Sequence, residues 1–140
     1  MTGDPLRVLV VDDQQDSAEM LSMLLEDRGH VTGVAVDGPS ALTLAEAFQP
    51  HVGLLDLGLP GMSGFELAMR LRAVPGLEHV RLVAVTGHGS DAVRAEARAS
   101  GFDEHFLKPV DLRALISLLE SARLALSGPP EAQTSDVAAS

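Results

Sequence analysis

The 140-residue sequence predicts one α/β domain: a doubly wound, five-stranded parallel sheet with strand order 2-1-3-4-5. Two observations lead to this prediction. Short apolar runs rich in Val, Leu and Ala alternate along the chain with stretches whose apolar residues recur at helical spacing. That alternation builds βαβ units, whose right-handed crossovers leave helices on both faces of a parallel sheet. No internal repeat or second domain is evident.

The apolar runs that we expect to form strands contain few charges. They are residues 6–11, 31–36, 51–56 and 81–86, with a shorter strand inside 102–108. The third run contains Val52, Leu54 and Leu55 and is apolar at consecutive positions. That pattern is typical of a strand buried on both faces of a parallel sheet.

Each expected helix begins at a residue that favours helix starts. These residues are Asp16, Pro39, Ser63, Ser90 and Asp111. Asp16 and Ser63 are each followed three residues later by a glutamate, so we expect two capping boxes. The helix after Ser90 offers little more than Val93 and several alanines for burial, and we expect it to pack weakly.

The expected domain spans residues 1–126. From residue 127 the sequence contains Gly128, Pro129 and Pro130, followed mainly by small and polar residues. We therefore expect 127–140 to be a disordered C-terminal tail.

Composition narrows the possible partners and location. The formal net charge of -10 and pI of about 4.7 argue against nucleic-acid binding and leave room for cations or a basic protein. No apolar run is long enough to span a membrane, and no signal peptide is evident, so we expect no membrane partner. The absence of cysteine is compatible with a reducing compartment, and we expect a cytoplasmic protein.

Charged and polar residues follow several of the expected strands. Asp12 and Asp13 follow the first strand, Asp56 and Thr86 end the third and fourth, and Lys108 follows the fifth. Because all strands of a parallel sheet end at the same edge, we expect these five residues to converge there. The simplest alternative is that Asp56 only opens a turn.

Three neighbouring carboxylates repel one another, by about 1 kcal/mol per pair at ~4 Å in water. A hard divalent cation such as Mg²⁺ would relieve this repulsion, and the five histidines show no spacing for zinc. A metal-supported Asp56 could attack phosphorus. Lys108, the only lysine among ten basic residues, and Thr86 could then contact the phosphoryl oxygens, with the backbone N–H groups of Gly58 and Gly87 as further donors.

With these residues in place, the chain resembles the receiver domain of two-component response regulators. The resemblance rests on Asp12-Asp13, on Asp56 in the segment LDLGLPGMSG, on Thr86-Gly87 and on Lys108-Pro109, and it extends from about residue 6 to 126. It implies a CheY-like, flavodoxin-like (βα)5 fold and phosphorylation of Asp56 by a histidine kinase or histidine phosphotransfer protein.

The resemblance also assigns roles to individual residues. Asp13, Asp56 and the backbone carbonyl of Gly58 would hold Mg²⁺, with Asp12 acting through water. The Lys108–Pro109 peptide bond is expected to be cis. Thr86 would be the first switch residue, and phosphorylation would alter the surface formed by the last two helices and the strand between them, which an unknown downstream protein would recognise.

The sequence departs from the family pattern at one switch position. His105 occupies the place, three residues before Lys108, where the family often has Tyr or Phe. A histidine there would add a charge that titrates near neutrality. Gly58 and His88 stand at the positions that flank the path of the attacking water in the family, and their net effect on phosphoryl lifetime stays open.

Several functions remain open at this stage. The chain is expected to be a stand-alone receiver that is no enzyme beyond its own phosphorylation and dephosphorylation, and a receiver fragment of a hybrid histidine kinase is the alternative. A Mg²⁺-dependent aspartyl-phosphate phosphatase is a remote alternative, because such enzymes usually carry a second Asp where this chain has Gly58. A receiver-like interaction module that no longer accepts phosphate is the third alternative.

Overall fold

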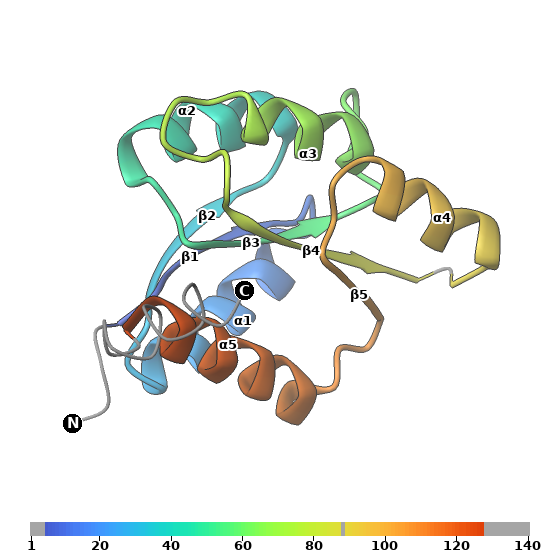
Figure 1. The fold of residues 1–140 in the computed structure, drawn as a ribbon. Helices are drawn as coiled ribbons and strands as arrows, with labels where there is room; N and C mark the ends of the chain where they lie inside the picture. Colours follow the sequence, from blue (N-terminus) through green and yellow to red (C-terminus); the bar gives the residue numbers. More distant parts are fainter. Residues whose placement is uncertain (1–4, 88, 128–140) are drawn as a thin grey trace, which may run out of the picture.

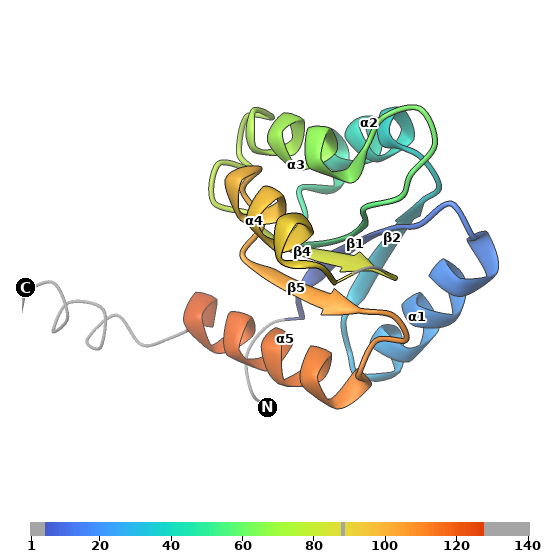
Figure 2. The ribbon, with the colours of Figure 1, turned by 90° about the vertical axis from the view of Figure 1, so that its right-hand side faces the viewer.

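In the computed structural model, which describes residues 5–87 and 89–127, a five-stranded parallel sheet lies between two helical layers (Figures 1 and 2). The strands are β1 (Arg7–Val11), β2 (Val31–Ala35), β3 (Val52–Asp56), β4 (Arg81–Thr86) and β5 (Glu104–Leu107). The helices are α1 (Gln15–Asp27), α2 (Gly38–Phe48), α3 (Gly64–Arg72), α4 (Asp91–Ala99) and α5 (Leu112–Ser127). The strand order is β2-β1-β3-β4-β5, which confirms the predicted topology.

The sheet separates two apolar cores. One core joins the sheet to α2, α3 and α4, and the other joins it to α1 and α5. Within β3, Val52, Leu54 and Leu55 are all buried, which confirms that this strand is covered on both faces. Alternate residues of the strands point into opposite cores. The parallel pairing of β3 with β1 and with β4 fixes the register of these three strands.

The start of α1 differs from the prediction. Asp16 does not cap this helix: the N-cap is Gln14, which provides no side-chain cap, and Asp16 lies inside the first turn. Just before the helix, the Asp12 carboxylate accepts a hydrogen bond from the Gln14 backbone N–H at 2.9 Å. Asp16 still places negative charge near the positive end of the helix dipole.

The other helix starts follow the sequence more closely. Ser63 and Ser90 accept hydrogen bonds from the backbone N–H groups of Glu66 and Val93, and Asp111 accepts from Arg113 and Ala114. The Glu66 side chain pairs with Arg70, so the second half of the expected capping box is not seen. The start of α2 is capped by Asp37, one residue before Gly38.

α4 is the most weakly packed of the helices, as predicted. Ala97 is its one fully buried residue, and Val93 is partly buried against the core. The expected tail at 127–140 lies almost wholly outside the described residues, and Ser127 itself belongs to α5. Within the part of the chain that is described, no helix combines the length and apolar character needed to cross a membrane.

Candidate functional site

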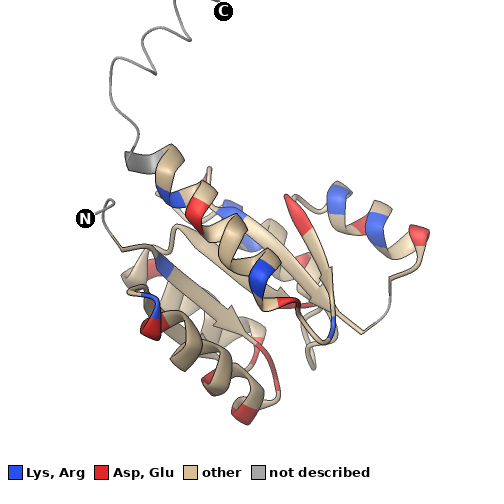
Figure 3. Ribbon diagram, turned by 90° about the horizontal axis from the view of Figure 1, so that it is seen from below, with Lys and Arg blue, Asp and Glu red and all other residues tan. Residues whose placement is uncertain are grey.

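The strands deliver the predicted site residues to one edge of the sheet. Asp56 is the last residue of β3 and is only 8% exposed, and Thr86 ends β4 and is also buried. Backbone hydrogen bonds continue past the strands: the N–H of Asp12 donates to the Ala35 carbonyl and that of Lys108 to the Thr86 carbonyl. The loops that carry Asp12 and Lys108 are therefore anchored to the sheet, and acidic ribbon segments lie near the tips of its arrows (Figure 3).

Asp12, Asp13 and Asp56 form a carboxylate cluster. One oxygen of each side chain lies within 4.8 Å of the others, and this is the one group of possible metal ligands found among the described residues. Hard oxygen donors in this number suit Mg²⁺, which usually takes a few carboxylates and keeps several waters. The side chains present therefore fit the cation that the sequence predicts.

Lys108 provides the positive charge nearest to this cluster. Its Nζ lies 3.1 Å from Asp56 Oδ2 and 3.4 Å from Asp12 Oδ2. Burial lowers the pKa of Lys108, but hydrogen bonding and attraction to Asp56, and then to Asp12, outweigh burial and raise it. Lys108 therefore stays protonated beside three carboxylates.

The pKa of Asp12 shows the opposing effects in this cluster. Burial raises it most, and the charge of Asp56 raises it further. The hydrogen bond from Gln14 and the charge of Lys108 act in the other direction and only partly compensate. Burial of the carboxylate is therefore the main reason that the pKa of Asp12 is raised, and a cation bound beside it would favour the charged form.

Two glycines set the surroundings of Asp56. The Gly58 N–H donates to Asp56 Oδ1 at 2.9 Å, while Oδ2 faces Lys108, so both carboxylate oxygens have a defined partner. A Cβ on Gly64 would lie 2.7 Å from the Asp56 carbonyl oxygen and 2.8 Å from Leu57 Cα. Only glycine lets α3 begin this close to the end of β3.

The remaining predicted residues fall in different places. The Lys108–Pro109 peptide bond is cis, as expected. His105 lies on β5 opposite Ala84, on the side of the sheet covered by α4, and is not part of the carboxylate cluster. Gly87 is exposed, and His88 lies outside the described residues.

A groove next to the cluster was missed by sequence reasoning. It has a volume of about 620 Å³ and runs between α1 and the segment joining β5 to α5, from Asp12 and Lys108 to Met20, Leu24 and Pro109. Its lining is mostly apolar, and Met20 and Leu24 are 66% and 42% exposed. The available signal was Met20, which lies outside the buried stripe of α1 together with exposed Met23.

Comparison with known proteins agrees with this geometry. The response regulator receiver domain family matches residues 8–120. A 14.6 kDa protein of Leptolyngbya boryana, described as uncharacterised, is 38% identical over 125 residues, covering 89% of this chain and 94% of that relative. The DNA-binding response regulator MtrA of Mycobacterium tuberculosis H37Rv is 40% identical over 111 residues, covering 79% of this chain and 47% of MtrA. The chain thus spans about half the length of MtrA.

Solved structures share the same architecture. The chemotaxis protein CheY4 of Vibrio cholerae superposes with a TM-score of 0.79 at 28% sequence identity, over 84% of this chain and 98% of CheY4. The chain therefore belongs to the response regulator receiver domain family of two-component signalling.

Proposed function

We propose that this receiver accepts a phosphoryl group on Asp56 from a histidine kinase or a histidine phosphotransfer protein. Receiver domains generally interact with such donors and bind Mg²⁺ at an acidic pocket. One observation carries the proposal for this chain: Asp56 is a nearly buried carboxylate that lies in a cluster with Asp12 and Asp13 and 3.1 Å from Lys108.

The transfer is a displacement at phosphorus. An oxygen of Asp56 forms the new bond while the bond between phosphorus and the donor's imidazole nitrogen breaks, and the electron pair returns to that nitrogen. A bound Mg²⁺ supplies charge neutralisation for the transferred group. We assign its ligands to Asp13, Asp56 and the Gly58 carbonyl, with Asp12 acting through water.

The residues around Asp56 have separate roles after transfer. The Lys108 ammonium, already beside Asp56 Oδ2, neutralises the added negative charge, and the Gly58 N–H donates to an oxygen on the other side. Thr86 ends the neighbouring strand and would donate its hydroxyl to the phosphoryl group. Its movement would shift the segment leading into α4, the weakly packed helix of the proposed output surface α4–β5–α5.

The groove beside α1 offers a docking place for the phosphodonor. It opens at Asp12 and Lys108, so an apolar helix lying in it would reach the site from the side. Met20→Glu should slow transfer from a phosphohistidine protein about tenfold or more and leave phosphorylation by acetyl phosphate unchanged. Met69→Glu, at an exposed methionine of α3, is the matched control. Equal loss with both donors would contradict docking in the groove.

The proposed chemistry is tested by intact mass after incubation with acetyl phosphate. We expect one added phosphoryl group with Mg²⁺, and none without the metal or in Asp56→Asn. Asp91→Asn, at an exposed position of α4, should behave as wild type. An adduct that persists in Asp56→Asn would overturn the assignment of the acceptor.

A second test separates accepting phosphate from responding to it. Lys108→Arg should still be phosphorylated but should lose the conformational response, because the rigid guanidinium cannot follow the phosphoryl group as a flexible ammonium can. NMR shifts of the α4 and β5 amides on phosphorylation would measure that response, and Arg113→Lys is the control. A normal conformational response in Lys108→Arg would contradict this role for the lysine.

We also propose that the receiver domain acts as a stand-alone cytoplasmic module whose own chemistry is limited to phosphorylation and dephosphorylation of Asp56. The near-complete coverage of a 14.6 kDa relative supports this proposal. Immunodetection of the native protein in its own cells tests it. A band near 14.7 kDa is expected, whereas a much larger band would support a receiver fragment of a hybrid kinase.

A further inference from the structure

A second hollow lies beside α4, which covers the face of the sheet opposite to the one that α1 covers. It has a volume of about 270 Å³ and lies between α4 and the start of β5. Arg94 and Arg98 line it from α4, and Asp103, Glu104 and His105 line it from the chain that enters β5. Neither arginine forms an ion pair within the described residues.

His105 lines this hollow as a partly buried residue whose Nε2 atom points into the protein. Its Nε2 is buried and has no hydrogen-bond partner among the residues that the structure describes. The facing residue on β4 is Ala84, which cannot accept a hydrogen bond through its side chain. Burial lowers the pKa of His105, and the nearby positive charge of Arg94 lowers it further.

The acidic side chains near His105 do little to balance the positive charge of Arg94. Asp103 already accepts hydrogen bonds from the Arg72 guanidinium and from the Leu82 backbone N–H. Glu104 also lines the hollow, but it is exposed, so water screens its charge, and it precedes His105 on a strand whose successive side chains point to opposite faces of the sheet. A second proton on His105 would therefore place a buried, unpaired N–H donor beside a guanidinium, which is costly.

The element above the ring can move. α4 buries only Ala97 completely, so few apolar contacts resist its displacement. In Figure 1, α4 extends away from the rest of the helical layer that contains α2 and α3.

We propose that His105 makes the position of α4 respond to pH: the neutral imidazole stays beneath the helix, and the protonated imidazolium leaves the hollow and displaces it. Acidification then shifts the same helix that the proposed phosphorylation of Asp56 would shift. The inference depends on the proposed function only for this signalling consequence, because the displacement itself requires neither phosphate nor metal.

The test is an NMR titration of the unphosphorylated, metal-free chain between pH 8 and 5. We expect the amide signals of α4 to follow one titration that coincides with the ring protons of His105 and has its midpoint below 6.5. His105→Phe keeps an aromatic ring and should abolish this titration. An unchanged titration of α4 in that variant, or none in wild type, would overturn the proposal.

Two further variants separate the causes. Arg94→Gln should raise the midpoint, because it removes the positive charge that opposes protonation, and Arg98→Gln should raise it less. His88→Gln controls for the other histidine close to α4 in sequence and should leave the titration in place. A midpoint that moves with His88→Gln and not with Arg94→Gln would reject His105 as the source. Failure of this test would leave the acetyl phosphate result for Asp56 unaffected.

Discussion

The two ends of the parallel sheet use polar side chains in opposite ways. At the end where the strands begin, two histidines accept hydrogen bonds from consecutive backbone groups: Leu6 N–H donates to His30 Nδ1 at 3.4 Å and Arg7 N–H to His51 Nδ1 at 2.9 Å. At the end where the strands finish, three carboxylates converge, and Lys108 is the one cation that forms ion pairs with them among the described residues.

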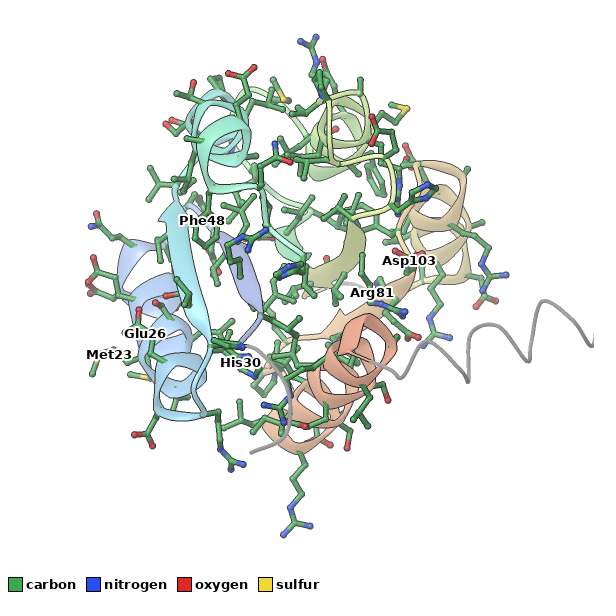
Figure 4. All side chains as sticks on the ribbon, turned by 60° about the vertical axis from the view of Figure 1, so that its left-hand side comes forward. Met23, Glu26, His30, Phe48, Arg81 and Asp103 are labelled. Carbon is green, nitrogen blue, oxygen red and sulfur yellow. The ribbon has the colours of Figure 1, made fainter. Side chains whose placement is uncertain are left out.

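Two arginines also form hydrogen bonds with backbone groups near the end of the sheet where the strands begin. The Arg72 guanidinium, from α3, donates to the carbonyls of Gly101 and Val80 and to Asp103. Arg7 donates to the carbonyls of Phe48 and Gln49 at the end of α2. Figure 4 labels His30, Phe48 and Asp103, three residues from separate segments of this region.

The difference teaches which polar residues hold the fold and which are available for chemistry. Polar groups where the strands begin satisfy backbone groups that would otherwise be buried without partners, so they stabilise the protein. The carboxylates where the strands end repel one another and are held in place by the strands, which leaves them free to bind a cation. Four predictions test this contrast.

The largest effect is expected for Arg72→Ala. The substitution leaves the Gly101 and Val80 carbonyls without their donor and Asp103 without its cation, at a cost of about 2–4 kcal/mol in the free energy of unfolding. Arg70→Ala, which removes an exposed pair with Glu66, should cost only about 0.3–0.5 kcal/mol. Urea denaturation measures both, and similar losses in the two variants would contradict the structural role of Arg72.

At the end of the sheet that carries the carboxylates, the free energy of unfolding should instead depend on bound metal. Mg²⁺ at a hundredfold excess over its dissociation constant should stabilise the wild type by about 2.7 kcal/mol. Asp13→Asn should weaken that effect and should stabilise the metal-free protein, because one repelling charge is removed. Urea denaturation with Mg²⁺ and with a chelator measures both quantities, with Asp27→Asn, at an exposed residue of α1, as the control. A metal-free Asp13→Asn that is less stable than wild type would argue against net repulsion.

The lowered pKa values of His30 and His51 predict that the folded protein loses stability in acid. Burial and the nearby Arg123 lower the pKa of His30, and burial and Arg7 lower that of His51. A lowered folded-state pKa means that the unfolded chain binds the proton more readily. The stabilisation is therefore present above pH 6.5 and is lost as the pH falls, by at most about 1.4 kcal/mol per pH unit for each histidine.

His51→Asn tests that contribution, since the asparagine oxygen can accept from Arg7 N–H without titrating. The variant should lose less stability than wild type between pH 7 and 5 in urea denaturation. His79→Asn, at an exposed histidine, should follow the wild-type curve. Parallel curves for all three proteins would show that His51 does not contribute.

The smallest effect, with the opposite sign, is expected at Asp12. Its pKa is raised above 3.8, mainly by burial, so the folded metal-free protein binds this proton more readily than the unfolded chain does. The contribution is therefore lost as the pH rises through the folded-state pKa, and Asp12→Asn should remove that dependence. Asp37 should make stability depend on pH in the opposite direction, because the hydrogen bonds that its carboxylate accepts from Ser40 lower its pKa. Urea denaturation between pH 3 and 6 distinguishes the two.

Much of the fold was predictable because its signals are local. The apolar runs and the helical spacing lie in neighbouring residues, and the observed strands differ from the predicted ones by only a residue or so at their ends. The start of α1 was not predictable in the same way. Asp16 looks like a cap in sequence, but the helix begins at Gln15 without a side-chain cap, and the nearby Asp12 carboxylate accepts a hydrogen bond from the Gln14 N–H.

The sequence by itself determined the order of elements and the set of residues that reach the carboxylate end of the sheet, since a parallel sheet brings all strand ends to one edge. The tertiary structure alone decided which of them touch, such as Lys108 with Asp12, 96 residues away. It also placed Arg72 among backbone carbonyls and left the His105 Nε2 without a hydrogen-bond partner in the part of the chain that the structure describes. These contacts depend on how the helices pack across the sheet, and packing joins residues that no local pattern relates.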